Sequence, residues 1–298
     1  MSITNQPADG LFNVLIVLTR VVISFGPQPR SDLINACGGG DDLGPMRRSH
    51  LNNTLNRWTE LGLFEDKEDV ISVAEPYRAE LGSNADKAER RLPKIARKIV
   101  LSAENNDLFW EAERNKSADF TRGLAWMLAQ DVYKLDPNEK KLFDLKQTQL
   151  PVEKVDLFFR NSARTDGLKA WMVYLGFARW MGQWCIDPTD ALRDILSDIF
   201  LSNKELSAPL FVQRAGELLP VLDGGQYRIK VEEQIAANAL APRQEGVLSF
   251  SMSRAIQRLA FEGDVKLDQR SDSEGVVSLV GVGGHLWRQF SHIRINDA

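Results

Sequence analysis

The sequence predicts a mainly α fold, in which a winged helix-turn-helix domain lies at each end of the chain and an all-helical domain lies between them. Residues 31–73 follow the order helix, loop, second helix and short two-stranded wing, and residues 248–280 repeat that order. The residues in between carry apolar side chains at helical spacing. The predicted domains are an N-terminal winged helix-turn-helix over 1–80, an all-helical middle domain over 81–204 and a C-terminal winged-helix-like domain over 205–298.

Two helices are expected before the third helix of the N-terminal domain, which is the candidate DNA-binding helix. The first covers about residues 10–25, where apolar side chains recur at helical spacing, and Gly26 and the proline after it end it. Ser31 caps the second helix, whose acidic first turn suits the positive end of the helix dipole. Residues 38–40 are three glycines and should break this second helix.

The third helix carries the repeat. It should begin at Pro45 and run to about Leu61, followed by a turn over 65–69 and a strand over 70–73. Its apolar positions recur at four and three residues, so they should face the first two helices. At an offset of 201 residues the helix matches a second copy, and the matched pairs are Leu51 and Met252, Leu55 and Ile256, Asn56 and Gln257, Arg57 and Arg258, Trp58 and Leu259, and Gly62 and Gly263.

The middle domain combines one basic helix with a strongly apolar segment. The basic helix covers about residues 86–101 and contains Pro93, which should bend it. Residues 171–184 are rich in aromatic side chains, and we expect one apolar helix there, at the centre of the domain core. Core positions, rather than a base-stacking platform, are predicted for Trp126, Trp171, Trp180 and Trp184.

The C-terminal domain should repeat the helix and the wing. A helix over 252–261 is capped by Ser249 or Ser251. The wing is expected to pair residues 266–270 with residues 276–280 across a turn. The tail that follows should add a strand or pack against this wing.

The composition is that of a soluble globular protein. Of the 298 residues, 43% are hydrophobic and 26% are charged, and the formal net charge is −4. With a negative net charge, any contact with DNA must come from a local basic patch. Polar residues interrupt the apolar run at 11–25, which favours a core helix over a signal peptide or membrane span. Cys37 and Cys185 form no CxxC pair, which favours a cytoplasmic protein.

The outer face of the third helix is the best candidate for binding DNA. Asparagine pairs with adenine, arginine pairs with guanine, and both side chains can hold phosphates. The alternative is a solvated helix face without a ligand. The acidic turn at 65–69 argues against the common pose in which the wing lies on phosphates. The candidate residues on this helix are Arg47, Arg48, Asn52, Asn53, Asn56 and Arg57.

Two other basic surfaces are candidates for DNA contact. The matching helix of the second copy carries Arg254, Gln257 and Arg258, although the wing after it has mixed charge. The basic cluster at 87–98 could follow a phosphate backbone beside the first winged helix, or it could form ion pairs with acidic neighbours. The predicted phosphate contacts in this cluster are Lys94, Arg97 and Lys98.

Motifs that carry enzyme chemistry are absent from the sequence. No glycine-rich loop precedes a Lys-Ser or Lys-Thr pair, and the glycines at 38–40 precede Asp41 and Asp42, which have the wrong charge for a phosphate cradle. His285 and His292 have no cysteine nearby, as a zinc site would require. We therefore expect a protein that is not an enzyme, with no catalytic residue, no cofactor and no metal.

The segment from Ala8 to Leu18, together with Leu51–Val73, resembles DpdG proteins. These proteins are encoded in bacterial gene clusters that place 7-deazaguanine bases in DNA and restrict unmodified DNA. The resemblance includes no diagnostic catalytic motif, so it assigns no functional residue. It implies a non-catalytic component of a phage-defence, restriction-modification system that works with ATPase, helicase or nuclease partners.

Three functional interpretations follow. The leading one is a DNA-binding or DNA-sensing accessory subunit that also binds protein partners. The second is a protein-interaction scaffold whose tandem winged helices hold partner proteins, which the acidic wing and the negative net charge favour. The third is a winged-helix transcription regulator, which would need a polar-lined ligand pocket near residues 171–184.

Overall fold

Helices and four small sheets make up the described part of the chain, and each of these sheets has two or three strands. Helices account for 55% of the residues and strands for 14%, which confirms the mainly α fold class. The chain divides into two units: unit 1 comprises Met1–Phe120 and Phe159–Leu175, and unit 2 comprises Thr121–Phe158 and Gly176–Ala298. The three domains predicted from the sequence stay a prediction. The computed structural model describes residues 3–4, 11–38, 44–112, 116–240, 244–270 and 275–296.

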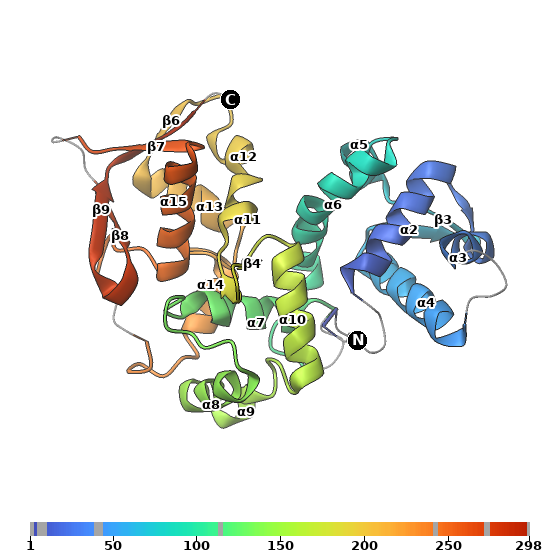
Figure 1. The fold of residues 1–298 in the computed structure, drawn as a ribbon, viewed down its shortest axis with the longest axis horizontal. Coiled ribbons are helices and arrows are strands. Elements are labelled where there is room, and N and C mark those ends of the chain that lie inside the picture. Colours follow the sequence, from blue (N-terminus) through green and yellow to red (C-terminus); the bar gives the residue numbers. More distant parts are fainter. Residues whose placement is uncertain are drawn as a thin grey trace. The chain divides into compact units, whose positions relative to one another are not determined.

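The first half of unit 1 is a group of three helices on a small sheet (Figure 1). The sheet order is β1-β3-β2 and all its pairs are antiparallel. Leu51, Leu55 and Trp58 are buried, as their spacing predicted. Glu68 and Asp69 both have positive φ, so β2 and β3 are joined by a tight two-residue turn. The elements are α2 (Phe12–Phe25), β1 (Gln28–Pro29), α3 (Arg30–Gly38), α4 (Pro45–Glu60), β2 (Phe64–Lys67) and β3 (Val70–Val73).

The second half of unit 1 is helical. The basic segment forms α6, which begins after Asn84, whose side chain accepts a hydrogen bond from the backbone N–H of Lys87. An aromatic cluster joins α2, α4 and α10, with Phe12 stacked on Tyr174 at 4.6 Å between ring centroids and Trp58 at 5.7 Å from Trp171. The elements are α5 (Glu75–Leu81), α6 (Ala85–Val100), η1 (Ala103–Asn105) and α10 (Ser162–Tyr174).

The predicted apolar helix through residues 171–184 is wrong. The α10 helix ends at Tyr174, Gly176 has a φ of 81°, and residues 178–186 form a hairpin instead. Glycine reaches this conformation without steric cost, which lets the chain leave the helix. Trp126, Trp171 and Trp184 are buried as predicted, but Trp180 lies on the hairpin and is 72% exposed, so its predicted core position is wrong.

The first part of unit 2 consists of this hairpin and several short helices, of which α7 starts in unit 1. Gln149, at the end of α8, is buried and accepts a hydrogen bond from the indole of Trp126 at 2.8 Å. The elements are α7 (Ala118–Ala129), α8 (Glu139–Gln149), α9 (Val152–Val155), β4 (Ala178–Trp180), β5 (Trp184–Ile186), α11 (Thr189–Arg193) and α12 (Leu196–Phe200).

The C-terminal part of unit 2 places α15 beside α11 and β8 (Figure 1). The tail contributes β9 and β10, as expected of a tail that adds a strand. One sheet has the order β6-β10-β7, and β8 pairs with β9 and also forms an isolated parallel bridge between Ser278 and Val247. The elements are β6 (Glu205–Ser207), α13 (Ala208–Leu218), α14 (Gln226–Glu232), α15 (Phe250–Glu262), β7 (Val265–Asp268), β8 (Val277–Val280), η2 (Val282–Gly284), β9 (Leu286–Phe290) and β10 (His292–Ile295).

The predicted C-terminal wing is therefore wrong. We expected residues 266–270 to pair with residues 276–280, but β7 pairs with β10 and β8 pairs with β9. The reason is competition between strands, because the tail supplies both a partner for β7 and a partner for β8. Most of the predicted turn, residues 271–274, lies outside the described residues.

The two copies of the repeat, 201 residues apart, form equivalent backbone hydrogen bonds at the ends of their helices. After α4, Leu63 N–H donates to Trp58 O at 2.8 Å, and after α15, Asp264 N–H donates to Leu259 O at 2.9 Å. The glycine before each donor has positive φ, 95° at residue 62 and 87° at residue 263. This is the left-handed ending that closes many helices.

The sheets continue the match between the two units. Strand β2 and strand β7 begin and end at positions 201 residues apart. Arg30 N–H donates to Asp69 O at 2.9 Å where β1 meets α3, and Ala208 N–H donates to Ser291 O at 2.7 Å where β6 meets α13. The strand of unit 2 that corresponds to β3 is thus β10, and the β8–β9 hairpin is inserted before it.

Within the described ranges, no helix is long and apolar enough to cross a membrane. Residues 39–43, which include two of the three glycines predicted to end α3, lie outside the described residues, and so do residues 8–10.

Candidate nucleic-acid interface

The outer face of α4 is polar and partly open to solvent. The helix starts at Pro45, which lacks a backbone N–H and is therefore suited to the first turn. Arg47 is exposed in that turn, and its side chain forms no hydrogen bond or ion pair with any other described residue. Its guanidinium can therefore reach an external acceptor.

The next polar side chains of α4 are held by local hydrogen bonds. Arg48 Nη2 donates to Asn35 Oδ1 of α3 at 2.9 Å. Asn52 Nδ2 donates to the carbonyl of Arg48 at 2.9 Å, and Asn53 Nδ2 lies 3.4 Å from Ser49 Oγ. All three predicted residues are partly exposed. These side chains are therefore held in place by near neighbours, while part of their surface stays open to solvent.

Arg30, at the start of α3, connects α4 to strand β2 and to the turn after it. Its Nη1 donates to Asn56 Oδ1 at 2.7 Å and its Nη2 donates to Asp66 Oδ2 at 2.8 Å. Asp69 lies 3.9 Å from the same guanidinium. The positive charge of Arg30 offsets acidic charge that would repel phosphates. The repulsion between this turn and a nucleic acid is therefore weaker than the sequence alone indicates.

A second ion pair acts on the same strand. Lys67 Nζ lies 2.5 Å from Glu65 Oε2. The close ammonium group of Lys67, together with the hydrogen bond from the backbone N–H of Glu75, lowers the pKa of Glu65 below its ordinary value. The carboxylate thus stays ionised and paired, and the β2–β3 hairpin shows fewer free negative charges than its composition implies.

The exposure expected of Arg57 and Arg97 is wrong. Arg57 is 5% exposed and forms an ion pair with Glu60 at 3.3 Å. Arg97 is 2% exposed, and its Nη1 donates to the carbonyl of Leu175 at the end of α10, at 2.6 Å. Both side chains lie along the inner edges of their helices, so both serve the packing of unit 1.

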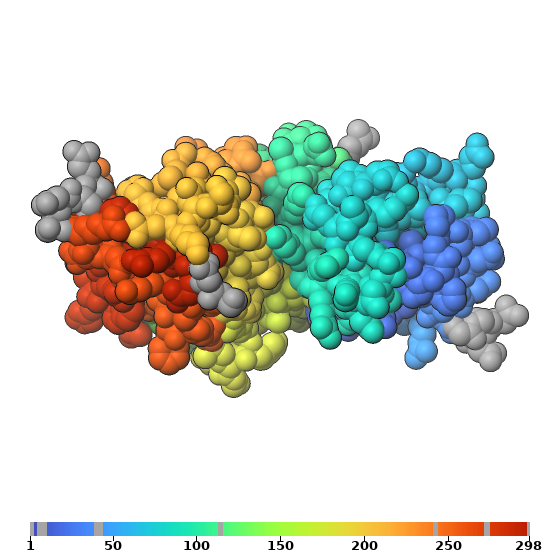
Figure 2. All heavy atoms as spheres, turned by 90° about the horizontal axis from the view of Figure 1, so that it is seen from above, coloured from blue at the N-terminus to red at the C-terminus, as the bar shows by residue number. Residues whose placement is uncertain are grey.

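The remaining basic residues of α6 are divided between structural and open positions. Arg91 donates to the carbonyl of Glu80 at 3.0 Å and thereby caps α5, and Lys98 pairs with the Glu80 carboxylate at 3.0 Å. Lys94 is half-buried. Figure 2 shows α5 and α6 (cyan to teal) as a continuous surface on one face of unit 1. Lys87 and Arg90 are exposed on α6 and form no side-chain ion pair with other described residues.

The polar face of α15 is covered by its own unit. Asp187, which is fully buried, has its Oδ2 3.2 Å from Arg258 and 3.6 Å from Arg254. Both approaches are ion pairs without hydrogen-bond geometry, since this oxygen accepts no hydrogen bond from any described residue. Gln257 Nε2 donates to the carbonyl of Val280 at 3.3 Å. The three predicted DNA contacts of α15 are thus engaged inside unit 2.

This charge network extends along the outer end of α15. Arg258 Nη2 donates to Glu262 Oε1 at 2.9 Å, and Arg193 also pairs with Glu262 and with Asp264. Partial burial raises the pKa of Glu262, but the hydrogen bond from Arg258 and the nearby arginine charges outweigh this, so the pKa is lowered overall. The carboxylate is therefore a fixed anion that holds two arginines.

The structure thus brings together one open set of predicted residues, Arg47, Arg48, Asn52, Asn53 and Asn56, on α4. It adds Arg30 to this set, which the sequence analysis missed. Its position at the start of the helix that precedes α4 was the signal available, because a long basic side chain there can reach the neighbouring helix. Contact between any of these residues and DNA stays a prediction.

The comparison with models of protein families gives a match. The family model described as DpdG-like matches residues 1–273. Neither the curated proteins nor the solved structures include a match to this chain. The match extends over most of the sequence, well beyond the N-terminal segments that carry the resemblance. The chain therefore belongs to the DpdG-like family, whose members come from 7-deazaguanine modification systems.

Proposed function

We propose that this protein is a non-catalytic, cytoplasmic accessory subunit that binds or senses DNA in a modification-dependent restriction and phage-defence system. It would work with protein partners such as an ATPase, a helicase or a nuclease. The observation that carries the proposal is the open polar face of α4, with Arg47 exposed and unpaired among the described residues.

The proposal interprets the segment from α2 to β3 as a winged helix-turn-helix domain. The supporting feature is the order of its elements: a helix, a short strand, two helices and a two-stranded hairpin that pairs with the short strand. In helix-turn-helix proteins, the second helix of the motif lies in the major groove with its N-terminal residues at the base edges. Here that helix is α4, and Arg47 and Arg48 lie in its first turns.

The family's link to 7-deazaguanine suggests what α4 could distinguish. Guanine presents two acceptors, N7 and O6, to the major groove, and arginine binds both with its two parallel N–H groups. A 7-deazaguanine base has carbon in place of N7 and therefore loses one of these acceptors. A guanidinium from α4 placed on guanine would bind unmodified DNA more tightly than modified DNA, by about 1–3 kcal/mol for a bidentate pair.

The test is fluorescence anisotropy of the full chain with a labelled duplex, titrated at several salt concentrations. A second duplex of the same sequence contains 7-deazaguanine at every guanine. We expect affinity to fall steeply with salt, because bound phosphates release counterions. We expect the double variant Arg47→Ala and Arg48→Ala to weaken binding by about 1–3 kcal/mol and to reduce the preference for the unmodified duplex.

The matched control removes the same charge elsewhere. Lys140 and Lys141 are exposed on α8 in unit 2, so the double variant Lys140→Ala and Lys141→Ala lowers the net charge equally. If both double variants lose the same DNA affinity, the loss comes from overall charge, and α4 is not part of the interface. No binding at low salt would contradict the proposal outright.

A protein-binding scaffold is the second candidate. The observation that favours it is the covered polar face of α15 together with a net charge of −4, neither of which suits a nucleic-acid surface. Under this interpretation the α4 variants lose affinity for a protein partner while the chain alone binds no duplex, so the same titration separates the two candidates.

A further inference from the structure

Unit 2 contains a pocket that DNA binding by α4 does not use. Its volume is about 630 Å³, within the range of small-molecule sites. The ends of α7 and α8, the helix α14, the start of α15 and the β8–β9 turn line it. All the lining residues that the structure describes belong to unit 2.

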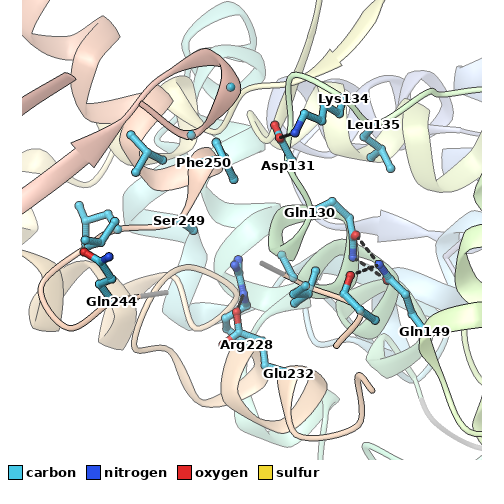
Figure 3. A pocket seen from close by; sticks show the side chains of 18 of the residues that line it. Gln130, Asp131, Lys134, Leu135, Gln149, Arg228, Glu232, Gln244, Ser249 and Phe250 are labelled. Carbon is cyan, nitrogen blue, oxygen red and sulfur yellow. Dashed lines mark hydrogen bonds and ion pairs between the residues drawn. The ribbon is translucent and has the colours of Figure 1, made fainter. Parts of the chain in front are cut away.

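One wall of the pocket is a saturated pair of amides. Gln130 Nε2 donates to Gln149 Oε1 at 3.0 Å, and Gln149 Nε2 donates to Gln130 Oε1 at 2.9 Å (Figure 3). The Gln149 oxygen also accepts from Trp126. Both amides are thereby fixed in orientation, and this wall is rigid and largely satisfied without a ligand.

Arg228 is the exception among the polar lining residues. It lies on α14, its side chain is 1% exposed, and it points into the pocket (Figure 3). Nε donates to Glu232 Oε1 at 2.6 Å, but Nη1 is buried and has no hydrogen-bond partner among the described residues. A buried, charged donor without an acceptor is destabilising, and such groups in native proteins usually have a ligand, an ion or water as partner.

We propose that this pocket binds a small organic anion, and that Arg228 holds its carboxylate or phosphate group. Carboxylates and phosphates match the planar N–H pattern of arginine, and a charge-assisted hydrogen bond in a site shielded from water is strong. Glu232 occupies only the Nε side of the guanidinium and leaves the Nη1 side for the ligand.

The other lining residues indicate what the rest of the ligand is like. Leu135, Leu145 and Leu248 contribute apolar surface, which suits an apolar body attached to the anionic group. Lys134 lies at the rim, is 74% exposed and pairs with Asp131 at 3.3 Å. The site therefore fits a compact molecule with one anionic head, and this inference does not depend on whether α4 binds DNA.

Isothermal titration calorimetry of the full chain tests the proposal with two probes, inorganic phosphate and benzoate, at constant ionic strength set with chloride. Binding of phosphate identifies a phosphate head as the ligand chemistry, and binding of benzoate identifies a carboxylate attached to an apolar body. We expect Arg228→Gln to weaken either interaction by at least about tenfold, because one charge-assisted hydrogen bond is lost. No binding of either probe in the millimolar range, or equal binding by the folded Arg228→Gln protein, overturns the proposal.

A second pair of variants keeps the test valid if Arg228→Gln does not fold. Leu286 lines the pocket and is 55% exposed, so a charged residue there should leave the core unchanged. Leu286→Glu should weaken binding of the anionic probe and Leu286→Lys should maintain or strengthen it, because the added charges act on the probe with opposite sign. Identical affinities for these two variants would contradict an anion in the pocket.

Discussion

The two units end a helix, turn and strand in the same way, yet they use the polar side of that helix differently. In unit 1, α4 leaves Arg47 open to solvent, Asn53 Nδ2 lies near Ser49 Oγ, and Asn56 accepts a hydrogen bond from Arg30. In unit 2, the corresponding positions are Arg254 and Gln257, which reach a buried carboxylate and a strand carbonyl. The same local design therefore produces one surface that can receive a ligand and one that holds its own unit together.

The inserted elements explain this difference. Unit 2 places the β8–β9 hairpin and the segment around Asp187 against α15, and β8 supplies the carbonyl that Gln257 contacts. Unit 1 has a two-residue turn between β2 and β3, and within the part of unit 1 that the structure describes no hairpin is inserted at this point. Whether a helix face is a binding site is thus decided by what the chain adds around it.

The largest expected effect concerns the shared core position. Trp58 and Leu259 are fully buried at matched places in α4 and α15. Trp58→Ala should lower the free energy of unfolding by about 3–5 kcal/mol and Leu259→Ala by about 2–5 kcal/mol, because each leaves a cavity. Urea denaturation followed by circular dichroism measures both. A loss below about 1 kcal/mol at either position would break the equivalence of the two helices.

Next in size is the difference between the matched arginines. A double-mutant cycle of Arg258→Ala with Asp187→Asn should show a coupling of about 1–3 kcal/mol, because Asp187 is a fully buried charge. The cycle of Arg57→Ala with Glu60→Gln should show less than about 0.5 kcal/mol, because Glu60 is half-exposed. Both cycles are measured by urea denaturation. Equal coupling energies would mean that the arginine of α15 stabilises unit 2 no more than the arginine of α4 stabilises unit 1.

A smaller and equal effect is expected at the two helix ends. Gly62 and Gly263 have positive φ, and a Cβ added at either meets no atom within 4 Å. Gly62→Ala and Gly263→Ala should each destabilise the protein by about 1 kcal/mol, from backbone conformation alone. Midpoints of urea denaturation give the comparison. If only one of the two variants loses stability, the two turns share their geometry but contribute differently to the free energy of unfolding.

The smallest expected effect depends on pH and is confined to unit 2. The lowered pKa of Glu262 means that its ion pairs add stability above its unfolded pKa of about 4.3, and that this stability is lost as pH falls through the folded value. At pH 7, Glu262→Gln should be less stable than the wild type by at most about 1 kcal/mol, because the carboxylate is partly exposed.

Stability measured at several pH values provides a control for this prediction. The difference between Glu262→Gln and the wild type should vanish at a pH well below 4, where both side chains are neutral. The corresponding residue of unit 1 is Leu61, which cannot titrate. A difference that persists unchanged in acid would assign the effect of the substitution to packing instead of charge.

The sequence alone determined the local part of this architecture. Proline at the start of α4, the apolar spacing of Leu51, Leu55 and Trp58, and the glycine after each matched helix act through neighbours in the chain. Such signals act over a few residues and can be read directly. The polar strip of α4 was predicted for the same reason, since helical periodicity assigns its residues to one side.

Only the tertiary structure decided which strands pair and which charged side chains are buried or exposed. Strand β7 had two possible partners, and the choice of β10 over β8 depends on contacts between residues far apart in the chain. Arg57 and Arg47 are both arginines of one helix, yet one is buried and the other is open. Burial and the unpaired Nη1 of Arg228 arise when distant segments converge, because desolvation depends on all neighbours in space and periodicity describes only neighbours along the chain.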